Sequence, residues 1–310
     1  MLANYARLSL AFEALAYALI AHWLHWLYGW PYALLGGAAL AIAFLNRFLM
    51  VCITAGVARL ASGPLEPANR VGWASGAAML LREGWAVSVA QLFEFPFHQW
   101  ALRMDPRGDG AKPVPVVLVH GYYSNRGYFR LLVRALEARG AAALYTPNFT
   151  SIFASIERFA AELQVEIERV CAATGAGQVV LVCHSMGGLA ARGYLARHGA
   201  SRVRKLVTIA SPHEGTVHAH LGGGENGRQM RRGSAFLAAL REREAGRGPG
   251  CATTSIYTPQ DNLVAPPQSS LLPWARNVAL PGLGHVEILR SERLARELEA
   301  ELRECGAAFP

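Results

Sequence analysis

The chain has 310 residues, of which 52% are hydrophobic and only 17% are charged. Disordered chains combine low hydrophobicity with high net charge, so this composition excludes intrinsic disorder. The 30 basic residues exceed the 22 acidic ones, for a net charge of +8, but the arginines are dispersed along predicted helices. That dispersal favours an anionic membrane surface over nucleic acid as the partner. The five cysteines are scattered and form no C-x-x-C pair, which argues against a zinc site or a disulfide scaffold.

Residues 8–30 form an apolar stretch long enough to cross a membrane as a helix of about 34 Å. Its end, LHWLYGW, is rich in tryptophan and tyrosine, which are enriched at membrane interfaces. Pro31 permits a turn, and a second apolar stretch follows. We predict a membrane-embedded helical hairpin over residues 1–60, joined near Gly29–Tyr32. A cleavable signal peptide is disfavoured, because the first stretch is too long and leads into a second one. A buried core hairpin is the alternative.

The basic residues around the hairpin predict its orientation. Arg7 precedes the first stretch, while Arg47, Arg59 and Arg70 follow PYALLGGAALAIAF, the apolar start of the second. Lysine and arginine are enriched on the cytoplasmic side, so both ends of the hairpin are expected there. If only the first stretch spans, the remaining chain lies on the opposite side.

The sequence of residues 61–112 predicts a connecting segment. Residues 71–104 are rich in tryptophan and phenylalanine, and either lie in the membrane interface or pack over the following domain. Residues 105–112, DPRGDGAK, are polar and glycine-rich, which places a domain boundary there.

From residue 113 to 310, strands and helices alternate, which predicts an α/β fold with a mostly parallel sheet flanked by helices. Continuous β-branched runs such as VVLV are typical of strands buried on both faces. The expected strands are 114–119, 141–145, 179–183, 203–210, 254–258 and 278–280. The expected helices are 128–139, 152–174, 187–198 and 291–305.

A candidate nucleophile lies between the strand VVLVC and the helix GLAARGYLARH. The sequence there is Cys183-His184-Ser185-Met186-Gly187. A serine on a sharp strand-to-helix turn projects its hydroxyl above the sheet, and the usual pattern is G-x-S-x-G, with Cys183 here in the first glycine's place. An ordinary helix-capping serine is the alternative. If acyl transfer occurs here, two N–H donors must stabilise the oxyanion, and the best placed are those of Met186 and of Tyr122.

A serine nucleophile needs a base that is itself oriented by an acid. In this topology the acid and then the base follow the serine, and Asp261 is the one aspartate after Ser185. His285, on the glycine-rich loop PGLGHVEIL, is the best base candidate. Its rivals are His198, which ends a helix, and three histidines that come well before Asp261, namely His213, His218 and His220. Glu287 competes for the acid role but lies only two residues from His285.

Five motifs together resemble the small bacterial lipases and esterases of the α/β-hydrolase fold. They are PVVLVHGYYSN, VVLVCHSMGGLAARGYL, VTIASPHEGT, SIYTPQDNLVAPPQSS and LPGLGHVEIL, and the likeness covers residues 113–305. The resemblance implies a carboxylic-ester hydrolase with Ser185, Asp261 and His285 as triad, and Tyr122 and Met186 as oxyanion donors. Residues expected to line the substrate site are His120, Gly121, His184, Gly187, Pro212 and Gly215, with His120 shaping its loop. The resemblance says nothing about the N-terminal hairpin.

Residues 211–250 form a long insertion in which 234–243 is expected as a short lid helix or a solvated surface helix. His213, His218 and His220 invite a metal-site interpretation, but they lack an acidic partner cluster, so we expect no metal and no cofactor.

The sequence thus predicts a lipase or esterase at the bacterial inner membrane, with a lipid or hydrophobic ester as substrate and no obligatory protein partner. The hairpin is expected to be dispensable for the chemistry. Phospholipase, thioesterase or acyltransferase chemistry on the same triad remains open, as does a catalytically idle membrane interaction protein.

Overall fold

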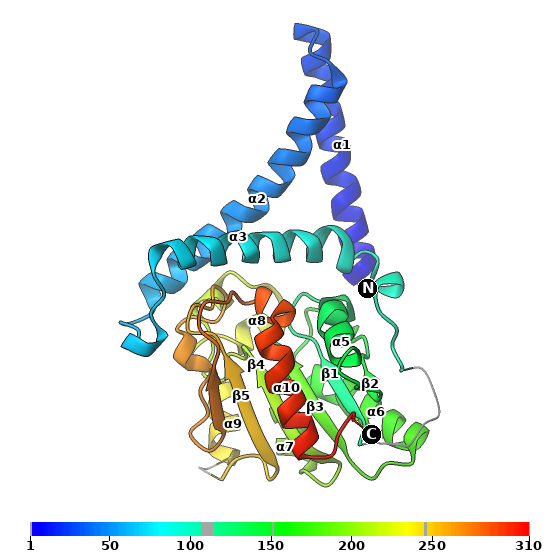
Figure 1. Cartoon of the computed structure of the whole chain (residues 1–310), viewed down its shortest axis with the longest axis vertical. Helices are drawn as coiled ribbons and strands as arrows, with labels where there is room; N and C mark the ends of the chain where they lie inside the picture. Colours follow the sequence, from blue (N-terminus) through cyan, green and yellow to red (C-terminus); the bar gives the residue numbers. More distant parts are fainter. Residues whose placement is uncertain (1, 107–113, 151, 245–246, 310) are drawn as a thin grey trace.

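Two long helices project from the rest of the molecule in the computed structural model, which describes residues 2–106, 114–150, 152–244 and 247–309. Helices α1 (Leu2–Tyr28) and α2 (Tyr32–Ala61) meet at a turn and diverge toward the remainder of the chain (Figure 1). Within the most apolar 18 residues of α1 none is buried, and within those of α2 11% are. The alternative of a buried core hairpin is therefore wrong, and the two helices fit a membrane-embedded region.

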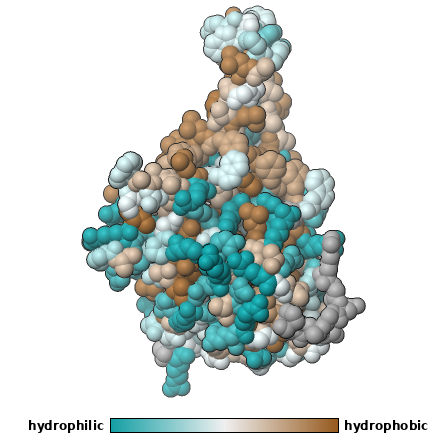
Figure 2. Space-filling model, in the orientation of Figure 1, coloured by the Kyte–Doolittle hydropathy of each residue, from teal (hydrophilic) through white to brown (hydrophobic). Residues whose placement is uncertain are grey.

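The two helices of the hairpin are joined by a polar contact at mid-height. Arg47 of α2 donates to both carboxylate oxygens of Glu13 in α1, at 3.0 and 2.7 Å, and Tyr17 donates to the same carboxylate at 3.0 Å. Around this contact the hairpin presents apolar side chains outward, and Figure 2 shows its shaft as a hydrophobic surface with a more hydrophilic tip. A paired carboxylate is the form in which a charge is tolerated at such a place.

A third helix lies between the hairpin and the sheet. Helix α3 (Trp73–Val89) continues through a π-helical turn, Ala90–Glu94, toward the short helix α4 (His98–Ala101) (Figure 1). Val51 of α2 packs in a buried cluster with Ala86 and Val87 of α3 and with Val286 from the far end of the chain. Residues 86 and 87 thus pack over the following domain, as one of the two alternatives for residues 71–104 predicts.

Within the described residues, the strands form a six-stranded sheet of order β2-β1-β3-β4-β5-β6, in which every neighbouring pair is parallel. This confirms the predicted α/β class; we call residues 114–309 the sheet domain. The strands are β1 (Val116–Val119), β2 (Leu144–Tyr145), β3 (Val179–His184), β4 (Val203–Ile209), β5 (Ala252–Tyr257) and β6 (Arg276–Ala279). Since all strands are parallel, the loops after them gather at one edge, which faces α3.

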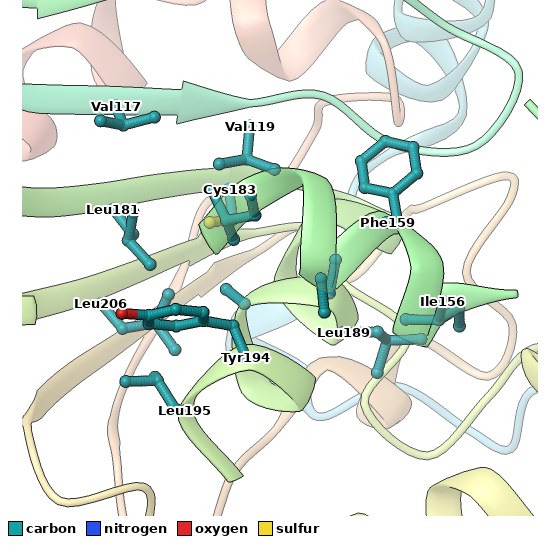
Figure 3. Packing of buried hydrophobic residues seen from close by; sticks show 14 of the residues in the cluster. Val117, Val119, Ile156, Phe159, Leu181, Cys183, Leu189, Tyr194, Leu195 and Leu206 are labelled. Carbon is teal, nitrogen blue, oxygen red and sulfur yellow. The ribbon is translucent and has the colours of Figure 1, made fainter. Parts of the chain in front are cut away.

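Helices cover both faces of the sheet. Helices α5 (Arg130–Glu137) and α10 (Glu292–Glu304) contribute to a buried cluster on one face, and α6 (Ile156–Thr174) and α7 (Met186–His198) to one on the other. In the second cluster, the side chains of Val119, Leu181 and Cys183 meet those of α6 and α7 (Figure 3). The rigid central strands thus fix where the loop after each strand begins.

Two helix starts differ from the prediction because side-chain caps satisfy the backbone N–H groups there. Helix α6 begins at Ile156, not at residue 152, because the Ser155 hydroxyl accepts the N–H of Arg158 at 3.2 Å. The helix expected at 128–139 opens as a 3-10 turn in which Asn125 caps Gly127. The 3-10 segments are Pro67–Asn69, Arg126–Phe129, Val217–His220, Pro267–Ser270 and Glu287–Arg290.

The insertion after β4 contains α8 (Gly224–Gln229) and α9 (Ala235–Glu244), the helix expected at 234–243. A buried ion pair holds the C-terminal end of α9. Arg192 of α7 donates to the two Glu244 carboxylate oxygens at 2.7 and 2.6 Å, and the two side chains are 2% and 4% exposed. Arg192 also donates to the carbonyl oxygen of His213 at 3.2 Å. Helix α9 is therefore fixed to α7 at its C-terminal end.

We expect the Glu244→Ala variant to lose about 3–5 kcal/mol of unfolding free energy, because it leaves the Arg192 guanidinium buried and unpaired. The control is Glu242→Ala, which removes an exposed carboxylate from the same helix. Urea denaturation of the detergent-solubilised full chain measures both. Equal stability of the two variants would contradict the role of the pair.

Candidate active site

Ser185 occupies the sharp turn between β3 and α7. Its backbone has φ 57° and ψ −128°, a conformation that is rare for residues with a side chain. The Ser185 N–H donates to the Ile209 carbonyl at the end of β4 (2.8 Å), and its carbonyl accepts the N–H of Gly188 (3.0 Å). The turn is thus fixed by the neighbouring strand on one side and by the first turn of α7 on the other.

Close backbone packing explains two of the predicted glycines. A Cβ on Gly121 would lie 2.8 Å from the Ser185 Cβ and 3.1 Å from the Met186 nitrogen. A Cβ on Gly187 would lie 2.5 Å from the Val119 carbonyl oxygen. The distances of 2.8 Å at Gly121 and 2.5 Å at Gly187 are shorter than a Cβ atom tolerates, so the loop after β1 fits against the Ser185 turn only with glycine at these two positions.

Asp261 and His285 form a buried pair at the same edge of the sheet. Nδ1 of His285 lies 3.0 and 2.9 Å from the two Asp261 carboxylate oxygens, so Nδ1 carries the proton. Oδ1 of Asp261 also accepts the N–H groups of Leu263 (2.8 Å) and Val264 (2.7 Å). Burial by itself would lower the pKa of His285, but Asp261, and to a smaller extent Glu83, hold that pKa above its usual value.

A carboxylate from α3 holds the loop that carries His285. Glu83 is fully buried and accepts the N–H of Val286 at 3.1 Å and of Glu287 at 2.7 Å. A Cβ on Gly284 would lie 2.3 Å from a Glu83 oxygen, so the loop reaches the carboxylate only with glycine there. Burial raises the pKa of Glu83 to about 7, against the two N–H donors and the His285 charge. The sequence analysis missed Glu83.

The other face of the same loop is held by Asn262 and His184. Asn262 accepts the N–H of His285 at 3.1 Å and donates to the Thr54 hydroxyl of α2 at 3.2 Å. Nε2 of His184 lies 3.0 Å from the His285 carbonyl oxygen, and burial, together with His285, holds the pKa of His184 well below its usual value. Neutral His184 therefore donates to the loop, and Asn262 connects the loop to the hairpin.

Ser185 and His285 line one cavity of about 400 Å³. Of the predicted lining residues, Gly121, His184 and Pro212 lie in its wall, as does Tyr122, whereas His120, Gly187 and Gly215 lie outside it. Further wall residues come from α2 and from the segment after α3, and the sequence analysis did not assign them to the site: Met50, Thr54, Gln91 and Phe95. Met50 and Thr54 bring the hairpin into the wall of this cavity, and the expectation that the hairpin is dispensable for the chemistry stays a prediction.

Three further histidines, His120, His213 and His218, are held by hydrogen-bonding partners. Nε2 of His120 accepts the N–H of Phe149 at 3.1 Å, and burial lowers the pKa of His120 to about 4, which fits the loop-shaping role. His213 is buried between Arg192 and Thr208, and the ring of His218 lies 3.2 Å from the Leu263 carbonyl. Among the described residues, no three metal-ligating side chains gather together. Glu287 pairs with Arg82, not with His285.

The chain is similar in sequence to a known family and to curated relatives. The family model for the α/β hydrolase fold matches residues 114–285, more than half of the chain. The chain is 32% identical to the triacylglycerol lipase of Vibrio cholerae over 112 residues, and 33% identical to that of Pseudarthrobacter phenanthrenivorans over 114 residues. These matches cover 34% of this chain and 35% of each relative, so the chain matches about a third of the length of these relatives.

Solved lipase structures share the fold. The mature form of Bacillus licheniformis lipase BlEst2 superposes with a TM-score of 0.54 at 18% identity, over 63% of this chain and 94% of that one. Aspergillus fumigatus lipase B gives a TM-score of 0.54 at 18% identity, over 64% of this chain and 54% of that one. The resemblance seen in the sequence motifs is confirmed at the level of family and fold.

We expect Glu83→Ala to lower the unfolding free energy by about 3 kcal/mol or more, because it leaves two buried N–H groups without an acceptor and opens a cavity. Glu83→Gln keeps the volume and one acceptor oxygen, so its loss should be smaller. Urea denaturation of the full chain ranks the two variants. A Glu83→Ala variant as stable as the wild type would show that the carboxylate does not hold the loop.

Proposed function

The chain belongs to the α/β-hydrolase fold family, and on that premise we propose that it is a membrane-associated serine hydrolase of carboxylic esters. The observation that carries the proposal is that Ser185, on its strained turn, shares one cavity with His285, whose ring is held by Asp261. A strained serine turn and an oriented imidazole are the two parts that nucleophilic acyl transfer needs. The triacylglycerol lipase names of the curated relatives support the same class.

In the proposed reaction, Nε2 of His285 takes the proton of the Ser185 hydroxyl as its oxygen attacks the ester carbonyl. The carbonyl oxygen becomes an oxyanion, and the returning electron pair expels the alcohol, which takes the proton from His285. Water then attacks the acyl-enzyme by the same route and releases the acid. Asp261, which raises the pKa of His285, stabilises the imidazolium in both steps.

The N–H groups of Tyr122 and Met186 are the proposed oxyanion donors. Met186 begins α7, directly after the nucleophile, and Tyr122 follows Gly121, which packs on the Ser185 turn. Tyr122 is further fixed because its hydroxyl donates to the Gly223 carbonyl at 3.0 Å. Donors held before the reaction begins need no reorganisation when charge develops.

The substrate proposed is an ester with a hydrophobic acyl chain that reaches the site from a membrane. The cavity wall includes Met50 of α2, a helix that also exposes large apolar side chains such as Leu45 and Leu49, and the aromatic rings of Phe95 and Tyr123. The hairpin fits two membrane spans with the sheet domain on one side, and the arginines beside it favour the cytoplasmic side of a bacterial inner membrane.

The triad is tested by single substitutions. We expect Ser185→Ala and His285→Ala each to lower kcat for a p-nitrophenyl ester by about 10⁴- to 10⁶-fold, and Asp261→Asn to do so less severely. Labelling by a fluorophosphonate probe should disappear in Ser185→Ala and persist in Ser201→Ala, a control at an exposed serine. Labelling that persists in Ser185→Ala would move the nucleophile to another residue.

Membrane association is tested on the full chain in isolated cell membranes. We expect the wild type to stay in the pellet after sodium carbonate extraction. The double variant Leu19→Arg/Leu40→Arg, which places charges at side chains 61% and 67% exposed, should be released. Release of the wild type into the supernatant would show that the hairpin does not hold the protein in the bilayer.

A further inference from the structure

A second groove lies outside the candidate active site, where the hairpin and α3 meet the sheet domain. It has a volume of about 780 Å³ and is lined by α2, α3, the segment after α3, and α5. Among the described residues it shares no lining side chain with the cavity of Ser185. In Figure 2 the hydrophobic surface of the hairpin gives way to the more hydrophilic surface of the sheet domain near the level of α3.

The membrane-proximal wall of this groove is aromatic. Phe44 of α2 stacks on Trp85 of α3 with ring centroids 5.8 Å apart, and Phe97 stacks on Trp100 at 5.4 Å. Trp85 and Phe93 are each 60% exposed, and Trp100 is 83% exposed. Exposed tryptophan and phenylalanine next to an apolar helix pair are typical of the membrane interface.

The opposite wall is cationic. Arg130 and Arg290 donate to the two oxygens of Glu94, at 3.1 and 2.7 Å, and this carboxylate is buried. Arg134, one turn after Arg130 on α5, is exposed and forms no ion pair within the described residues. One carboxylate among three guanidinium groups leaves two positive charges in excess in the groove.

We propose that this groove binds an anionic phospholipid of the surrounding bilayer, with its phosphate at Arg134 and its acyl chains against the aromatic wall. Guanidinium groups bind phosphate oxygens with charge-assisted hydrogen bonds, and Arg134 has donors free for them. A soluble polyanion would leave the rings of Phe44, Trp85 and Trp100 in water, whereas a phospholipid covers both walls at once. Bound there, the lipid would bridge the hairpin to α5.

The test uses the full chain in neutral detergent, mixed with equal amounts of dialkyl-ether phosphatidylglycerol and phosphatidylcholine. Ether lipids contain no ester bond, so the outcome is independent of the proposed hydrolysis. After washing, mass spectrometry quantifies the lipid retained per protein. We expect the wild type to enrich phosphatidylglycerol over phosphatidylcholine, and Arg134→Gln to lower its retention about tenfold, the value of one charge-assisted hydrogen bond of about 1.4 kcal/mol.

Two variants serve as controls. Arg197→Gln removes an exposed arginine from α7, far from the groove, and should retain phosphatidylglycerol as the wild type does. Trp100→Ala should lower the retention of both lipids, since it removes part of the acyl-chain wall. Equal retention of the two lipids by the wild type, or equal retention of phosphatidylglycerol by Arg134→Gln and Arg197→Gln, would overturn the proposal. Displacement of the lipid by glycerol 3-phosphate would also overturn it, by assigning the groove to a soluble phosphate.

Discussion

The buried carboxylate of Glu83 is the contact on which the arrangement of the molecule depends. It lies on α3, outside the sheet domain, and satisfies two N–H groups in the loop directly after His285. A buried N–H without an acceptor lowers the free energy of unfolding by about 1–3 kcal/mol, and a buried carboxylate without donors lowers it by more. The loop N–H groups and the Glu83 carboxylate therefore stabilise each other. Because of this contact, α3 completes the candidate active site and cannot be regarded as a linker between the hairpin and the sheet.

The two halves of the site are held by different kinds of force. Ser185 is held by tight backbone packing, in which Gly121 and Gly187 admit no side chain. Asp261 holds the imidazole of His285, Asn262 accepts its backbone N–H, and Glu83 holds the loop directly after it, so these polar contacts come from two separate segments. Tight backbone packing fixes the strained turn, while the Asp261 carboxylate orients the imidazole and raises its pKa.

The sequence predicted those features that local patterns encode. Strand runs and the serine turn are short-range signals, whereas Asp261 and His285 were predicted from their order along the chain after Ser185. The structure places these residues at one edge of the sheet. Glu83 has no such signal, because its partners are backbone groups more than 200 positions away. The available hint was a glutamate in a mostly apolar helix whose other charged residue is Arg82, and Glu94 in the turn after that helix was a second hint. Likewise, nothing local shows that Met50 and Thr54 turn toward the cavity, since their environment is created by α3 and the insertion.

The chain order of these contacts has a consequence for biosynthesis. The hairpin and α3 precede the sheet domain in the chain, so they leave the ribosome before Asp261, Asn262 and His285 do. The Glu83 carboxylate is therefore made long before the N–H groups of Val286 and Glu287 with which it pairs. The sheet domain therefore assembles against helices that are already made. A chain made only as far as Asp261 still lacks the His285 loop, so its Glu83 carboxylate has neither of its two N–H partners.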